Sequence, residues 1–129
     1  MSVSVAFEPT AGLVVIPAKL SGPKGDAVIR VALDTGATST LVGWDWLILT
    51  GYEPASTLAR VRVTTGSGVE FAPRVVIQKI EALEREVRNF PIVCHTLPPS
   101  ATVDGLLGLD FLRGQRLVVD FRAGTIALD

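Results

Sequence analysis

The chain is built from short segments in which apolar and polar residues alternate, separated by turns rich in glycine and proline. Alternation with a period of two places one set of side chains on each face of a β-strand, so the pattern predicts an all-β protein. Two alternating runs flank Gly66-Ser67-Gly68, which predicts a hairpin with a flexible tip. The expected strands are Leu13–Leu20, Ala27–Asp34, Arg60–Thr65, Val69–Phe71, Leu117–Phe121 and Thr125–Leu128.

Helical segments are short in this pattern. Trp44–Thr50 is followed by Gly51, and Leu109–Arg113 by Gly114, and glycine is the usual residue after a helix end. The segment Ile80–Arg88 supports two interpretations. It is rich in helix formers and has apolar residues at helical spacing, which favours a helix, whereas the residues on both sides of it favour strands. The local pattern leaves this choice open.

Composition and charge narrow the class of protein. The 129 residues are 48% hydrophobic and carry a formal net charge of −1. We therefore expect one globular domain spanning residues 1–129 rather than a disordered chain. Nearly balanced charge argues against nucleic acid as a partner. A single cysteine, Cys94, and a single histidine, His95, exclude an intrachain disulfide and a metal site made of several such ligands.

The mean hydropathy of +0.44 raises the question of a membrane span. A spanning helix needs about 20 predominantly apolar residues, and the longest apolar runs are interrupted by Pro17, Lys19 and Asp45. We therefore expect no membrane span. The start of the chain carries Glu8 and no basic region, so we expect no signal peptide and a cytoplasmic location. The surplus apolar surface suggests a subunit interface.

Two segments carry candidate chemistry. An apolar strand ends at Asp34-Thr35-Gly36-Ala37-Thr38, and about 70 residues later Leu106-Leu107-Gly108 precedes the second expected helix. A strand that delivers an aspartate at its end would place the carboxylate at a partly desolvated position. Each segment alone is compatible with an ordinary structural element: the first with a turn, the second with a strand–helix junction.

Together, in this order and spacing, the two segments and the intervening hairpin resemble the retropepsin-like aspartic proteases. The resemblance extends from about Leu13 to Leu128. It implies a closed antiparallel β-barrel-like acid-protease fold with one or two short helices. The hairpin of Gly66, Ser67 and Gly68 lies where the family carries its flap. The family also has a hairpin in the undecided region, so we expect strands at Val75–Leu83 and Glu86–Cys94.

The resemblance implies an endopeptidase that acts on extended polypeptides without a metal or cofactor. Two aspartates must share one proton across a catalytic water, and the chain has no second Asp-Thr-Gly or Asp-Ser-Gly. The second aspartate would therefore come from a second copy, which makes the protein a homodimer. An alternative on the same fold is a peptide-binding or dimerisation module with little or no proteolysis.

Individual roles follow from the matching positions. Asp34 would be the catalytic acid and base, Thr35 would brace the paired loops, and Gly36 would donate its N–H near the aspartates. The substrate-binding residues would be Ala37 and Thr38 in the cleft and Gly66, Ser67 and Gly68 at the hairpin tip. Leu106, Leu107 and Gly108 would pack behind the Asp34 loop as structural support. Viral members often carry aspartate where this chain has Thr38.

Other possible catalytic or binding sites have less support in the sequence. Cys94 and His95 are adjacent, so on a strand they would point to opposite faces and could not form a nucleophile–base pair. We expect Cys94 in the core and His95 at a strand end. Gly66-Ser67-Gly68 lacks the lysine and the length of a phosphate-binding loop. The charged residues expected to form a solvated face are Glu81, Glu84, Arg85, Glu86 and Arg88.

Overall fold

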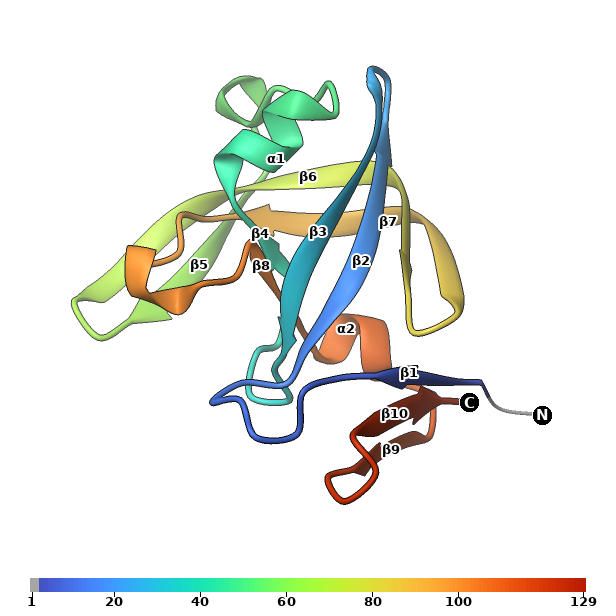
Figure 1. Cartoon of the computed structure of the whole chain (residues 1–129). Coiled ribbons are helices and arrows are strands. Elements are labelled where there is room, and N and C mark those ends of the chain that lie inside the picture. The colour runs from blue at the N-terminus through green and yellow to red at the C-terminus, as the bar shows by residue number, and fades with distance from the viewer. Residues whose placement is uncertain (1–2) are drawn as a thin grey trace.

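The computed structural model describes residues 3–129, except for the side chain of Thr65. Figure 1 shows two sheets and short helices along the chain. The strands are β1 (Ser4–Ala6), β2 (Val15–Gly22), β3 (Gly25–Leu33), β4 (Leu41–Val42), β5 (Arg60–Thr65), β6 (Gly68–Ala82), β7 (Arg85–Cys94), β8 (Gly105–Leu107), β9 (Leu117–Asp120) and β10 (Thr125–Leu128). The helices are α1 (Trp44–Leu49) and α2 (Leu109–Leu112), with 3-10 turns at Pro54–Ser56 and Pro99–Ala101.

Six strands close into a barrel. They follow the order β2-β3-β8-β4-β7-β6, and β6 pairs back onto β2 through Lys19–Ser21 and Lys79–Glu81. Most neighbours are antiparallel, but β8 runs parallel to β3 and β4 runs parallel to β7. This architecture confirms the predicted closed, mainly antiparallel β-barrel with short helices.

The alternating sequence pattern explains which side chains fill the barrel. In β3, Ala27, Ile29 and Val31 are buried, whereas Val28 and Arg30 between them face outward. Most expected strands match the structure within two residues at each end, but Val69–Phe71 and Val75–Leu83 are parts of one strand, β6. The pattern gave no separate strand at β1 or β4, because segments of two or three residues are too short to show a period.

The ambiguous segment Ile80–Arg88 forms a tight hairpin, not a helix. Ala82 pairs with Arg85, and the two residues between them, Leu83 and Glu84, adopt positive φ values of 53° and 61°. Such a turn matches the twist of antiparallel strands. Pairing with neighbouring strands therefore overrides local helix propensity here.

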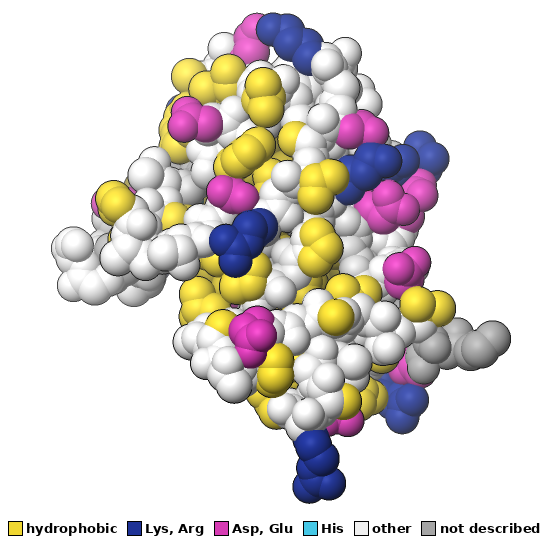
Figure 2. All heavy atoms as spheres, viewed as in Figure 1, with side chains coloured by type: hydrophobic (Ala, Val, Ile, Leu, Met, Phe, Trp, Pro, Cys, Tyr) yellow, Lys and Arg dark blue, Asp and Glu magenta, His cyan; other side chains and the backbone are white. Residues whose placement is uncertain are grey.

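A second sheet, in the order β1-β10-β9, lies beside the barrel, with α2 between the two and α1 at the far end of the molecule (Figure 1). Apolar side chains also remain at the surface. Figure 2 shows several of them gathered over β2, β3 and α1, between scattered charges. Within residues 3–129, no helix has both the length and the apolar character that crossing a membrane requires.

Candidate active site

The Asp34 loop begins where β3 ends. Leu33 pairs in parallel with Leu107 of β8, and the Asp34 N–H donates to the Leu107 carbonyl at 3.0 Å. The loop then turns sharply, and the Gly36 N–H donates to Asp34 Oδ1 at 2.9 Å. Asp34 is half-buried. The loop thus presents an oriented carboxylate from a rigid strand end.

Gly108 supports this loop from behind by coming closer than any side chain would allow. A Cβ at this position would lie 2.7 Å from both the carbonyl carbon and oxygen of Ser39, and 2.8 Å from the Ala37 oxygen. The next residue continues the contact, because the Leu109 N–H donates to the Ala37 carbonyl at 2.8 Å. Leu107 is fully buried, whereas Leu106 lines the cleft in front of the loop.

A polar network between Thr40 and Asp110 fixes the other end of the loop. The Thr40 N–H lies 3.0 Å from both carboxylate oxygens of Asp110, and its hydroxyl donates to Oδ1 at 2.7 Å. The same hydroxyl accepts the Gly108 N–H at 3.1 Å. Thr40 is completely buried, so these partners replace water. Sequence analysis missed both residues, because 70 positions separate them and no local motif marks the pair.

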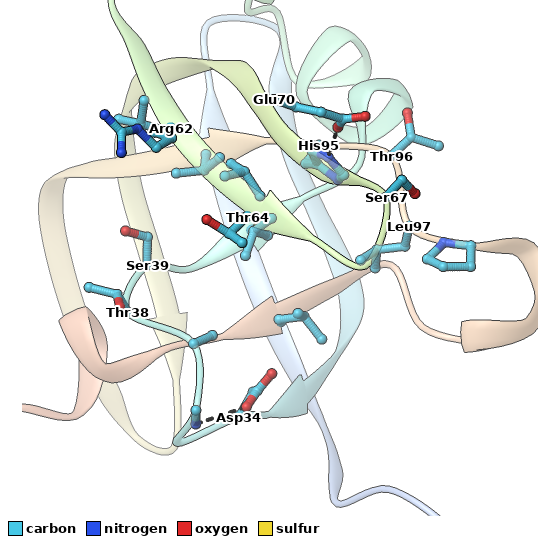
Figure 3. Close-up of a pocket in the computed structure, with 18 of the residues that line it drawn as sticks. Asp34, Thr38, Ser39, Arg62, Thr64, Ser67, Glu70, His95, Thr96 and Leu97 are labelled. Carbon is cyan, nitrogen blue, oxygen red and sulfur yellow. Dashed lines mark hydrogen bonds and ion pairs between the residues drawn. The ribbon is translucent and has the colours of Figure 1, made fainter.

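A cleft of about 850 Å³ opens beside Asp34. Most of its lining comes from three parts of the chain: the Asp34 loop, the β5–β6 hairpin above it and the segment 95–99 (Figure 3). Of the predicted site residues, those on its lining are Asp34, Gly36, Ala37, Thr38, Ser67 and Leu106. Thr35, Gly66 and Gly68 are exposed and lie off the lining. The hairpin prediction is confirmed, although β6 continues well beyond Phe71, to Ala82.

Charged side chains in the cleft are few. Asp34 lies at its floor, and Arg62 projects from β5. Glu70 of β6 contacts His95, with 2.9 Å between Oε2 and Nε2 (Figure 3). Among the described residues, no three His, Cys, Asp or Glu side chains gather as metal ligands.

Cys94 and His95 point away from each other, as predicted. Cys94 is buried in the core, where desolvation raises the pKa of its thiol to about 11. His95 follows the end of β7 and lines the cleft instead. One surface prediction is wrong: Arg85 is half-buried, donates to the Phe111 carbonyl and lies 5.1 Å from the centre of the Phe111 ring. It therefore packs onto α2 rather than joining a solvated face.

Both a family model and solved structures match the chain. The family model described as "gag-polyprotein putative aspartyl protease" matches residues 24–114. Among solved structures, the fold resembles the crystal structure of a retropepsin-like aspartic protease from Rickettsia conorii, with a TM-score of 0.71 and 17% sequence identity. That similarity covers 99% of this chain and 89% of the other. No curated protein sequence matches the chain.

Proposed function

Because the chain belongs to the gag-polyprotein aspartyl protease family, we propose that it is an aspartic endopeptidase that cleaves extended polypeptides as a homodimer. The observation that carries the proposal is the placement of Asp34. Its half-buried carboxylate, oriented by the Gly36 N–H, lies at the floor of a cleft large enough for several substrate side chains. A hairpin above the cleft would exclude water from a bound peptide.

The second aspartate would come from a second copy of the chain. Among the described residues of one copy, the cleft lining offers Asp34 no carboxylate partner, because Glu70, the other carboxylate there, is held by His95. A two-fold axis beside the loop would bring the two Asp34 residues together. Thr35 is exposed beside Asp34, which suits a residue that would contact the partner's loop.

The chemistry follows from two close carboxylates that hold one proton between them. The ionised carboxylate removes a proton from a water molecule, whose oxygen attacks the scissile carbonyl carbon. The protonated carboxyl donates its proton to the carbonyl oxygen, which gives a neutral tetrahedral diol. The carboxyl that took the water proton then protonates the amide nitrogen, while the other carboxylate accepts a proton from one diol hydroxyl. The C–N bond breaks, the carbonyl re-forms as a carboxylic acid, the amine leaves, and the pair again holds one proton.

Substrate would bind as an added strand. Extended peptides bind by backbone hydrogen bonds to exposed strand edges, and their side chains alternate between the two sides. Thr38 of the Asp34 loop and Ser67 of the hairpin lie on opposite sides of the cleft (Figure 3), and Ala37 also lines it. Gly66 and Gly68 would let the hairpin tip change its backbone conformation as the peptide enters.

The proposal is tested with a peptide library and a denatured protein substrate between about pH 3 and 7. The wild-type protein should cleave, and Asp34→Asn should lose cleavage while remaining folded and dimeric. A statine-type transition-state mimic should bind the wild-type dimer tightly. Equal turnover by the two proteins would exclude catalysis by Asp34. A folded dimer that binds peptide and does not cleave it would instead indicate the binding module.

A further inference from the structure

We propose that Glu70 and His95 are positioning residues that hold the β5–β6 hairpin over the cleft, and that protonation of His95 strengthens this link. The kinetic part of this inference rests on the proposed protease function. The structural part concerns the hairpin alone and can be tested without any enzyme activity.

The outer part of the hairpin extends away from the barrel. β5 is the last strand of its sheet and pairs with β6 from Arg60–Pro73 to Thr65–Gly68. β6 joins β7 from Arg74 onward, so the part of the hairpin before Arg74 extends beyond the barrel. A two-stranded hairpin has marginal stability by itself. A side-chain contact between the hairpin and the barrel would therefore influence how long it stays in place.

Glu70 and His95 supply such a contact. They lie 25 residues apart in the sequence, one on the outer half of β6 and the other directly after β7. His95 also begins the segment that continues through Thr96 and Leu97 along the wall of the cleft (Figure 3). The 2.9 Å contact thus joins the roof of the cleft to its wall.

The contact between Glu70 and His95 is partly shielded from solvent. The His95 side chain is only 22% exposed, against 57% for Glu70, so water screens the contact incompletely. Outside the cleft, the pair adjoins a smaller hollow lined by Trp44, Phe71 and Pro73. The other titratable or charged groups around these two cavities are Cys94, whose raised pKa keeps it a neutral thiol, and Asp34 and Arg62 in the cleft.

Protonation adds a charge to this contact. An imidazole takes up a proton between about pH 5 and 8, and an imidazolium attracts a carboxylate by its charge in addition to the hydrogen bond. While Glu70 is ionised, protonation of the His95 ring converts the contact from a hydrogen bond into an ion pair. The hairpin should then be held more firmly at mildly acidic pH than at pH 8. A peptide binding under a hairpin already in place loses less conformational entropy.

The test compares Glu70→Ala, His95→Ala and the double variant with the wild type, and uses Arg60→Ala as the matched control. Arg60 is an exposed charged residue on the same hairpin that lies off the cleft lining. For an extended peptide at pH 5.5, each single variant should raise KM about fivefold and leave kcat within about twofold. The double variant should match the single variants, because both remove the same contact. Glu70→Gln should keep most of the hydrogen bond and lose the gain on acidification.

Hydrogen exchange of the hairpin amides, corrected for intrinsic rates, gives a readout independent of cleavage. Exchange should be faster in both alanine variants, and the wild-type protection should fall between pH 5.5 and 8, whereas the Glu70→Gln protection should not. His95→Gln serves if His95→Ala does not fold. Unchanged hairpin exchange, or single effects on KM that add fully in the double variant, would overturn the proposal. If even the wild type fails to cleave, the protease function fails, and hydrogen exchange alone decides the positioning role.

Discussion

Replacing Gly108 by alanine should destabilise the protein by forcing the Asp34 loop away from α2. The added Cβ would lie 2.7–2.8 Å from three backbone atoms of Ser39 and Ala37. Backbone atoms cannot rotate away as a flexible side chain can, so the loop itself must move. Overpacking typically costs about 1–3 kcal/mol, and three simultaneous overlaps place this substitution in the upper half, at about 2–3 kcal/mol. With about 2.1 cal/mol/K of unfolding entropy per residue, 129 residues give a fall in Tm of about 7–11 °C.

Thermal unfolding followed by circular dichroism measures this effect. Gly12→Ala is the matched control, because no heavy atom lies within 4 Å of a Cβ there and its φ is not positive. That control should change the stability by less than about 1 kcal/mol. All proteins must be compared at one concentration, since an oligomer's Tm depends on it. A Tm for Gly108→Ala within about 2 °C of the wild type, or an equal fall in both variants, would refute the reasoning.

Further substitutions and a chemical probe test other contacts. Asp110→Ala should lower the free energy of unfolding by about 2–3 kcal/mol in urea, because it strands the buried Thr40 hydroxyl and N–H; a loss under about 0.5 kcal/mol would contradict this. Glu84→Gly should stabilise the protein by about 1 kcal/mol, since glycine tolerates the φ of 61°; an unchanged urea midpoint would argue against strain there. Cys94 should react with a thiol reagent at pH 8 only after unfolding, because burial raises its pKa to about 11 and thiolate is the reactive form; rapid labelling of the native protein would disprove its burial.

Local periodicity was enough to predict the strands that alternate strongly, such as Ala27–Asp34 and Arg60–Thr65. It also predicted that Cys94 and His95 would separate, because neighbouring side chains on a strand point to opposite faces. The hairpin at Ile80–Arg88 could not be decided locally. Its strands form because β7 and β2 offer hydrogen-bond partners to β6, and such partners come from distant parts of the sequence.

The candidate site, too, was predictable from the sequence only in part. The position of Asp34 at a strand end followed from the apolar run before it, and its relation to Gly108 followed from a family resemblance. The Thr40–Asp110 network and the packing of Arg85 on Phe111 did not follow from either. Both contacts join segments that meet only after the barrel closes. No spacing rule connects residues that are neighbours solely through tertiary structure.

The length of β6 has a mechanical consequence. One continuous strand runs from the hairpin tip at Gly68 to Ala82, and its inner part pairs with both β2, at Lys79–Glu81, and β7. The hairpin is therefore the outer end of a strand whose inner end is anchored in the core. Bending should concentrate near Pro73 and Arg74, where the partner of β6 changes from β5 to β7. Movement of the hairpin tip and stability of the barrel then depend on the same strand. A stiffer inner half of β6 would therefore also slow the opening of the hairpin.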